Sequence, residues 1–338
     1  AKGLYVSPGF IDIHTHGRGG YQVMDSTFES LNAISKASLQ TGVTSFLVST
    51  VTMPIESISH AIENVVKNKE KVEGAQILGI HFEGPYLNKA HKGAQPEEYC
   101  VKPDIEQFKR YQKAAHGLIK YITMAVENDE DFTLTKYCSQ NNVVVSIGHS
   151  NATYEQAVQA YAHGARSMTH VYNAMTPFTH RANGLVGGAL RIRNMYGEII
   201  CDGNHSTLAA LNNFFTSKGP DYSIMITDSL MCKGFPVGTK FDFGGQEVVI
   251  YPDGSAHLVE AGNLAGSTLN VNKGLKILIE DALVPVNYAI NACTSNPARC
   301  LHVDDRKGTI GVGYDADLVV LDRDYEVVQT YCKGVGQK

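Results

Sequence analysis

Short apolar runs rich in β-branched residues recur along the first two thirds of the chain, and stretches of helical character separate them. The eight runs cover residues 9–14, 44–51, 76–82, 118–126, 142–147, 166–170, 198–201 and 222–227. Nearly continuous apolar strands that alternate with helices are typical of a parallel sheet covered on both faces. Eight strand–helix repeats match the count of a closed (β/α)8 TIM-like barrel, so we predict an α/β fold of that type.

An open, doubly wound sheet is the alternative architecture for such a pattern. That fold normally has a glycine-rich phosphate-binding turn directly after its first strand. Here the first run ends instead in His14-Thr15-His16. The barrel is therefore the favoured prediction.

The pattern changes after the eighth run. Residues 234–265 contain short strands punctuated by glycine, such as Glu247–Tyr251, and we predict a hairpin insertion there. Two helical stretches follow, near 269–281 and 285–293, and the tail at 308–334 has the pattern of antiparallel strands joined by a turn. A short hairpin cannot bury itself alone.

We therefore predict two units. The barrel takes residues 8–303, and a small β-sandwich domain takes residues 1–7 and 304–338. The sequence begins with Ala1 and not with Met. We expect it to be a processed or partial copy of a longer protein, whose missing N-terminal piece supplies further strands of the sandwich.

Composition limits the classes of function. The chain has 338 residues, of which 43% are hydrophobic and 19% charged, as in a globular protein with a substantial core. The formal net charge of −5 argues against a nucleic-acid-binding protein, which needs a basic face. No apolar run reaches about 18 residues and no signal peptide is evident, so no membrane partner is expected.

The seven cysteines are odd in number and widely spaced, and none forms a Cys-x-x-Cys pair. This spacing suggests neither a disulfide framework nor a zinc–thiolate site. Reduced, structural thiols in a cytoplasmic protein are the expectation.

Polar side chains follow the carboxyl ends of five of the eight runs, at the face where barrels carry their active sites. These residues are His14 and His16 after the first run, Glu83 after the third, His149 after the fifth, His170 after the sixth and Asp228 after the eighth. In a strand, residues two apart point the same way, so both imidazoles of the first run can reach one metal ion. Imidazole and carboxylate without thiolate suit Zn²⁺, Fe²⁺ or a similar divalent ion.

Each residue alone has a simpler explanation. A single histidine at a strand end is more often structural than a ligand, and an aspartate there is commonly a helix cap. The repetition at one rim favours the metal site. The other histidines are weaker candidates: His81 faces the same way as Glu83, His91 and His180 lie in rim loops that can touch a substrate, and the remaining five are expected to be solvated or structural.

Several motifs together resemble a known family. Pro-Gly-Phe-Ile-Asp-Ile-His-Thr-His at 8–16 resembles the opening of the amidohydrolase superfamily. More narrowly, further segments are similar to the N-acetylglucosamine-6-phosphate deacetylase family, and in chain order they are 81–88, 92–96, 148–150, 168–177, 201–205, 226–229, 264–267 and 296–299. The matches run from about residue 8 to 334. His-x-His alone would indicate only the superfamily.

The resemblance implies a role for each matching position. Glu83, His149 and His170 would bind one metal ion, and His14 with His16 would bind a second in members that keep this pair. Asp228 would be the general acid and base. Substrate contacts would come from Ala94, Gln95, Asn173, Ala174, Arg181, His205, Leu264, Ala265 and Gly266. A homodimer is also implied, in which an arginine that contacts the phosphate comes from the partner subunit.

Two departures from the family pattern matter. Some relatives lack the first histidine pair, use one metal ion and carry histidine where this chain has Gln95; the combination here resembles the two-metal branch. The loop at 178–184 differs from the usual His-His-Arg-Glu-Pro-Gly, but it retains Arg181, so phosphate binding is still expected.

The expected reaction is the hydrolysis of N-acetylglucosamine 6-phosphate to glucosamine 6-phosphate and acetate, in amino-sugar catabolism and cell-wall sugar recycling. A metal ion lowers the pKa of a bound water from 15.7 towards roughly 7, and Asp228 would move the proton to the leaving nitrogen. Gln95 or His170 would help the metal to polarise the acetyl carbonyl, and His205 would bind a sugar hydroxyl or the phosphate. Two alternatives are an amidohydrolase for another N-acyl or cyclic amide substrate and a non-catalytic metal-binding barrel.

Overall fold

The computed structural model describes residues 3–337, and a sheet of eight parallel strands forms its centre. Each strand pairs with the next one along the barrel, in the order β2, β5, β6, β7, β8, β9, β10, β11. Their bounds are Phe10–Asp12, Val43–Ser49, Gln76–Glu83, Ile119–Met124, Val144–Ile147, Ser167–Met168, Tyr196–Ile200 and Ser223–Ile226. All eight predicted strands are therefore confirmed, and so is the α/β barrel.

The barrel closes between its first and last strands through a short seam. Beyond the ends of β2 and β11, the amide of Asp228 donates to the His14 carbonyl, and the amide of His16 donates to the Ser229 carbonyl. Below them, the Asp12 carboxylate accepts from the Thr227 hydroxyl at 2.6 Å and from Arg18 at 2.9 Å. All of these side chains are buried. The seam places His14 and His16 beside Asp228.

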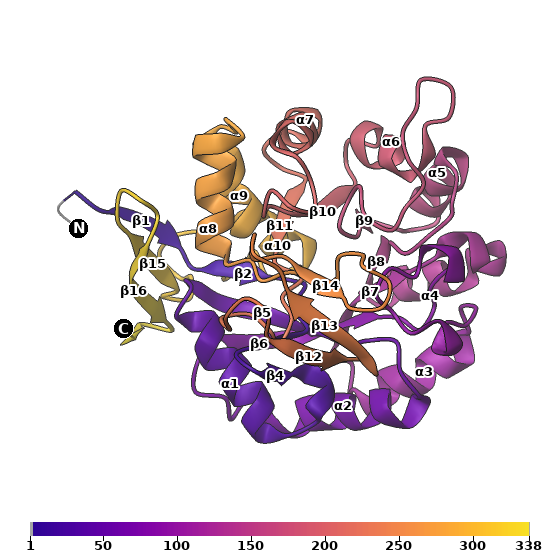
Figure 1. The fold of residues 1–338 in the computed structure, drawn as a ribbon, viewed down its shortest axis with the longest axis horizontal. Helices are drawn as coiled ribbons and strands as arrows, with labels where there is room; N and C mark the ends of the chain where they lie inside the picture. Colours follow the sequence, from indigo (N-terminus) through magenta and orange to yellow (C-terminus); the bar gives the residue numbers. More distant parts are fainter. Residues whose placement is uncertain (1–2, 338) are drawn as a thin grey trace.

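Helices surround the sheet (Figure 1). Those that connect successive strands are α1 (Phe28–Leu39), α2 (Ile55–Asn68), α3 (Ile105–Ala114), α4 (Thr133–Gln140), α5 (Tyr154–Ala162), α6 (Gly184–Arg191) and α7 (Leu208–Lys218). Helix α2 shows why they dock: Ile58, Ala61, Ile62 and Val65 recur at helical spacing on the face that it buries. Strands such as β5 and β8, covered on both sides, are buried throughout.

The two helical stretches predicted after the barrel strands are present with one addition. Helix α8 (Val271–Lys276) continues as a π-helical segment, Ile277–Asp281, and α9 (Val286–Cys293) follows. A further short helix, α10 (Ser295–Cys300), was not expected. Helix α9 packs against β11, and α10 contacts both β2 and β11, so they cover the seam from outside.

The predicted insertion is a three-stranded antiparallel sheet, one strand more than the expected hairpin. Its strands are β12 (Lys240–Phe243), β13 (Gln246–Ile250) and β14 (Ala256–Leu258). Phe243, Val248 and Leu258 form a small apolar core with Leu230, which follows β11. This core fixes the insertion at the C-terminal rim of the barrel.

The tail strands form a second sheet beside the barrel (Figure 1). Strand β1 (Tyr5–Pro8) pairs with β15 (Leu318–Leu321), which pairs with β16 (Val327–Cys332) and then β17 (Val335–Gln337), all antiparallel. Val319 and Leu321 are buried in the main core. Residues from both ends of the chain thus build the small unit; its extension into a sandwich and its boundaries remain predictions.

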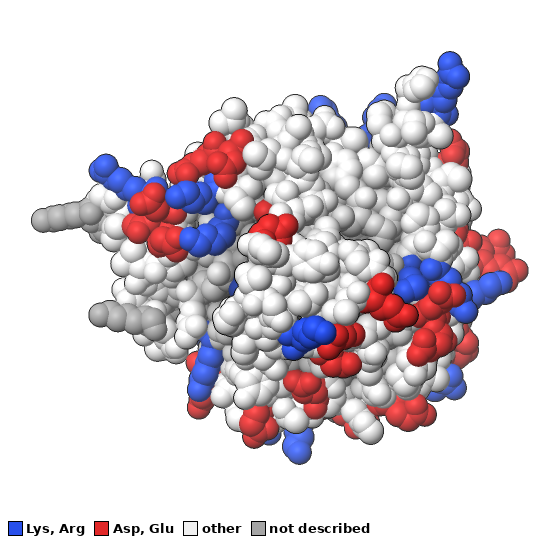
Figure 2. All heavy atoms as spheres, in the orientation of Figure 1, with Lys and Arg blue, Asp and Glu red and all other residues white. Residues whose placement is uncertain are grey.

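Charged side chains of both signs lie on the face drawn in Figure 2, and the thiols are buried. On the face drawn in Figure 2, acidic and basic side chains are interspersed around the edge, whereas the upper central part carries few charges. All seven cysteines are buried and free. Within residues 3–337, no helix is both long and apolar enough to span a bilayer.

Candidate active site

A cavity of about 380 Å³ opens at the carboxyl ends of the barrel strands. Twelve of the predicted site residues line it: His16, Glu83, Ala94, Gln95, His149, His170, Asn173, Ala174, His205, Asp228, Leu264 and Gly266. Three do not. His14 lies fully buried behind the wall, Ala265 is buried in the small core of the insertion, and Arg181 is exposed on the loop before α6.

The functional side chains share a position relative to their strands. His14, His149, His170 and Asp228 each come two residues after the last residue of a strand, and Glu83 ends β6. His149, His170 and Asp228 adopt positive φ angles of 48°, 31° and 48°. Such angles are strained for residues other than glycine and concentrate at functional sites. Three separate strands thus turn sharply to aim their side chains into one cavity.

Glu83, His149 and His170 form one ligand group, which we call the 83/149/170 group. The Nε2 atoms of the two histidines are 3.0 Å apart, and they lie 3.4 and 3.5 Å from Glu83 Oε1. Each imidazole is fixed by backbone: Nδ1 of His149 donates to the His91 carbonyl at 2.8 Å, and Nδ1 of His170 donates to the Asn173 carbonyl at 3.2 Å.

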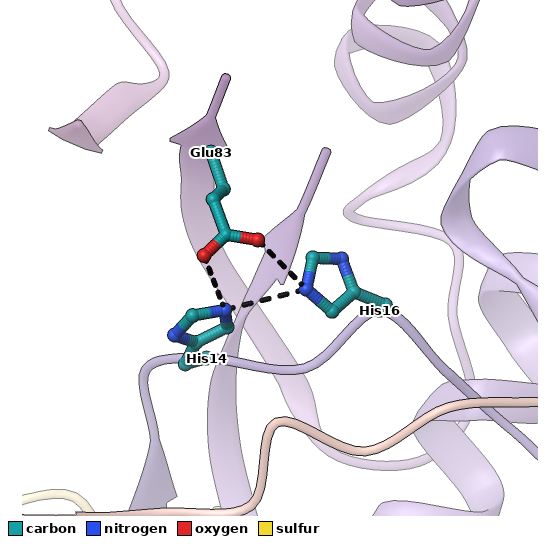
Figure 3. A group of neighbouring side chains, drawn as sticks. All are labelled: His14, His16 and Glu83. Carbon is teal, nitrogen blue, oxygen red and sulfur yellow. Dashed lines mark hydrogen bonds and ion pairs between the residues drawn. The ribbon is translucent and has the colours of Figure 1, made fainter. Parts of the chain in front are cut away.

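His14, His16 and Glu83 form a second ligand group, the 14/16/83 group (Figure 3). The two Nε2 atoms are 3.3 Å apart; that of His14 is 3.3 Å from Glu83 Oε1, and that of His16 is 3.1 Å from Glu83 Oε2. Nδ1 of His14 donates to the carboxylate of Glu198 at 2.9 Å. Nδ1 of His16 has no hydrogen-bond partner among the described residues.

The donor atoms of both groups fit a divalent metal ion. Where Nδ1 donates to an oxygen, the neutral ring keeps a bare lone pair on Nε2. As neutral rings, His149 and His170 therefore point two lone pairs at each other across 3.0 Å, which is unfavourable unless a proton or a metal ion lies between them. Glu83 Oε1 is buried without a hydrogen bond. The donor atoms of the 83/149/170 group are 3.0–3.5 Å apart. In a tetrahedral site with metal–ligand bonds of 2.0–2.2 Å, neighbouring ligand atoms are about 3.4 Å apart, so the observed spacing is close to that of a metal site.

The electrostatics of the second group are dominated by its carboxylates. Burial by itself would lower the pKa of His16, but its hydrogen bonds with Asp228 and Glu83 raise it to about 9. Burial likewise opposes a charge on His14, yet Glu83, Asp228 and Glu198 together raise its pKa well above the usual value. Without a metal ion these rings therefore hold protons, and a bound cation has to displace them.

Asp228 faces the second group from the opposite side. Its Oδ1 lies 3.3 Å from Nε2 of His16 and 3.7 Å from Nε2 of His14. Burial would raise the pKa of Asp228, but the neighbouring His14 and His16 outweigh it and hold that pKa well below the ordinary range. The carboxylate is thus kept ionised, as a base must be. Gly266 packs so closely against the backbone of Asp228 that a Cβ there would lie 2.7 Å from the Asp228 carbonyl oxygen.

Gln95 and His81 take more specific places than the sequence indicated. Gln95 Nε2 donates to Glu83 Oε2 at 2.8 Å, and its Oε1 accepts from the amide of Thr52, so both ends of the amide are engaged. His81 does not join either ligand group. Its Nε2 pairs with the Thr123 hydroxyl at 2.7 Å, and its ring packs edge-on against His14 with centroids 4.3 Å apart.

Seven of the nine residues expected to contact substrate line the cavity, His205 and Ala94 among them. Nδ1 of His205 donates to Asp202 at 2.7 Å, and this carboxylate raises the pKa of His205 although burial opposes it. The Ala94 carbonyl accepts from Gln246 of the insertion at 2.6 Å. His205 is therefore held by a carboxylate at the mouth of the site, and Gln246 ties the insertion to the loop that carries Gln95.

Several residues escaped the sequence-based reasoning. Phe243 and Asn263 reach the cavity from the insertion, and Ile200 lines it at the end of β10. Glu198 lies inside the apolar run of β10. A charged residue within a buried strand could have indicated a functional side chain. His91, expected in a rim loop, does line the cavity, and its carbonyl also anchors His149.

The chain is similar to several known proteins over nearly its whole length. The profile of the amidohydrolase family matches residues 5–335. The chain is 40% identical to the N-acetylglucosamine-6-phosphate deacetylase of Bacillus subtilis (strain 168), over 97% of this chain and 83% of that protein. It is 32% identical to an N-acetylgalactosamine-6-phosphate deacetylase of Escherichia coli O157:H7, over 97% and 86%. The crystal structure of N-acetylglucosamine-6-phosphate deacetylase from Pasteurella multocida superposes with a TM-score of 0.92 at 31% identity, covering 99% of this chain and 87% of that one.

Proposed function

The chain belongs to the amidohydrolase family, a metal-dependent family of hydrolases, and on that premise we propose that it hydrolyses the acetamide of N-acetylglucosamine 6-phosphate. The products are glucosamine 6-phosphate and acetate, in amino-sugar catabolism and the recycling of cell-wall sugars. We place the reaction in the cytoplasm, since all seven thiols are free and the substrate is a phosphorylated sugar.

One observation supports this proposal most strongly. Asp228 Oδ1 lies 3.3 Å from the Nε2 atom of His16, in a cavity that also exposes Glu83, His149 and His170. A purely structural metal site is closed by its ligands and has no use for an ionised carboxylate at an open rim. A hydrolase needs that carboxylate next to the nucleophile.

When bound, a divalent ion such as Zn²⁺ or Fe²⁺ lowers the pKa of a water and polarises the amide carbonyl. Glu83, His149 and His170 would hold one ion, and His14 and His16 would hold a second with the shared Glu83. Asp228 Oδ1 takes a proton from the attacking water and then delivers it to the leaving nitrogen, which cannot depart as an anion. Gln95, bonded to Glu83, keeps that carboxylate oriented at the cavity wall.

The phosphate is best bound by a permanently charged side chain, and the described residues that line the cavity include no lysine or arginine. Among the described residues that line it, only histidines such as His91 and His205 can carry positive charge. Arg181 is exposed on the loop between β9 and α6, which projects from the molecule (Figure 1). We infer that the protein is a homodimer in which Arg181 of each subunit binds the phosphate in the other subunit's site, as its planar fork is suited to do.

The activity is tested by incubating the metal-loaded protein with N-acetylglucosamine 6-phosphate and assaying free acetate. N-acetylgalactosamine 6-phosphate serves as the competing substrate, because one relative is named for it. We expect the gluco epimer to have the higher kcat/KM. Asp228→Asn should lower kcat by about 10²–10⁴-fold while metal content is unchanged. No acetate from either sugar would exclude the proposal, and near-normal turnover of the variant would exclude the role of Asp228.

The shared site is tested by subunit complementation. Asp228→Asn removes the base but leaves Arg181, and Arg181→Ala does the reverse. If each subunit lends its arginine to the other, mixed dimers of the two variants regain one intact site, and random mixing restores about a quarter of the sites. If the mixture is no more active than the two variants measured separately, then Arg181 acts within its own subunit or not at all.

A further inference from the structure

Glu198 is a fully buried carboxylate with a single partner. It lies in the middle of β10, exposes none of its surface, and accepts the Nδ1–H of His14 at 2.9 Å through Oε2. Its Oε1 has no hydrogen-bond partner among residues 3–337. Placing such a group in a barrel interior is costly unless a positive charge compensates it.

The charges around it identify the missing partner. Glu83, Asp228 and Glu198 are buried together, and within the described chain each of them forms ion pairs only with histidines. A hydrolytic nucleophile adds a fourth negative charge. Two divalent ions balance four negative charges.

We propose that Glu198 is the positioning residue that makes the 14/16/83 group a metal site, by fixing the His14 ring with Nε2 aimed at Glu83 and by supplying the negative charge that a second cation requires. This inference rests on the metal chemistry of the proposed function. Carboxylates that orient a ligating histidine in this way typically change metal affinity by 10–100-fold when they are removed. Figure 3 shows the geometry that Glu198 maintains: His14 and His16 point at the two oxygens of Glu83.

Two substitutions separate the two contributions. Glu198→Gln keeps a carbonyl oxygen that accepts from His14 Nδ1 but removes the charge, whereas Glu198→Leu removes both. Metal-free proteins are titrated calorimetrically with Zn²⁺ in the absence of substrate. The wild type should bind two ions per subunit; the weaker site should lose about tenfold in affinity in Glu198→Gln and about 100-fold in Glu198→Leu, with the stronger site unchanged. Asp129→Asn is the matched control, because this buried carboxylate caps α4 through Leu134 and Thr135 and touches neither group.

Thermal melting with and without Zn²⁺ distinguishes positioning from a structural role. In the metal-free protein Glu198 pairs with the buried His14 ring, and removing one partner of a buried ion pair is destabilising, so Glu198→Leu should itself melt lower than the wild type. The distinguishing quantity is the gain in melting temperature on adding Zn²⁺: we expect it to be smaller in Glu198→Leu than in the wild type, whereas a purely structural role would leave the gain unchanged. Two ions bound with wild-type affinity in both variants, or a single ion in the wild type, would overturn the inference. A one-ion wild type that still releases acetate would leave the proposed function intact.

Discussion

The two ligand groups share Glu83 but differ in how their imidazoles are held. In the 83/149/170 group, both Nδ1 atoms donate to backbone carbonyls, those of His91 and Asn173. In the 14/16/83 group, one Nδ1 depends on the side chain of Glu198 and the other has no partner among the described residues. Backbone carbonyls persist through almost any substitution, whereas one carboxylate can be lost by a single change. The first group is thus intrinsic to the fold, and the second depends on one residue.

The shared residue gives the largest expected effect. Glu83→Gln removes the anionic ligand of both groups, so we expect metal content to fall to near zero and acetate release to fall by more than about 10⁴-fold, the upper end of what one catalytic group contributes. Metal analysis by mass spectrometry and the acetate assay test this together. Retention of one full equivalent of metal would show that the groups are not joined through Glu83.

The comparison itself is tested by removing one histidine from each group. His149→Asn should abolish binding at the 83/149/170 group and lower kcat by about 10²–10³-fold, the scale of losing a preorganised electrostatic contact. In His16→Asn the factor by which kcat falls should be at least ten times smaller, because the ion at the 83/149/170 group is retained. Both variants are measured with saturating Zn²⁺ and with their metal content determined. Equal losses in the two variants would mean that neither group works without the other.

The smallest expected effect comes from a substitution at the rim of the cavity, which should leave both ligand groups unchanged. Asp202 raises the pKa of His205, so the imidazolium is present below that pKa and is lost as pH rises through it. In Asp202→Asn the pKa falls, and the alkaline limb of the kcat/KM profile should move to lower pH. At pH 8, KM should rise by about tenfold, which corresponds to the lower end of the range of about 1.5–3 kcal/mol that a hydrogen bond to a charged group contributes. An unmoved profile would exclude His205 as the titrating contact, and His205→Gln provides the pH-independent reference.

Most of the barrel and of its ligand sets could be predicted because both follow from local pattern. Buried parallel strands leave continuous apolar runs, and the residue just past each run must lie at one rim, so His149, His170 and Asp228 were identifiable without coordinates. The side chains that hold these ligands in place could not be predicted in the same way. Whether Glu198 faces His14, or Gln95 faces Glu83, depends on how eight strands are staggered around the barrel and on side-chain torsions.

Arg181 illustrates a different limit of the sequence. The motif placed it at a substrate contact, yet it lies on an exposed loop outside the cavity of its own chain. A sequence orders residues along one chain and does not state which copy of that chain completes a site. The insertion shows a third limit: its strand pattern was evident, but the contact of Phe243 with the ring of His16, with centroids 5.7 Å apart, follows only from where the small sheet docks.

The seam between β2 and β11 has a consequence for how the protein folds. It joins Asp12 to Thr227, residues 215 positions apart, and it brings His14 and His16 to Asp228. Contacts of such long range are the slowest to form, because the whole intervening chain must first be ordered. A folding intermediate in which the barrel is still open can bring together Glu83, His149 and His170. It cannot yet bring His14 and His16 to Asp228. Catalytic competence would then appear only with the last step of folding, after the first ion can already be bound.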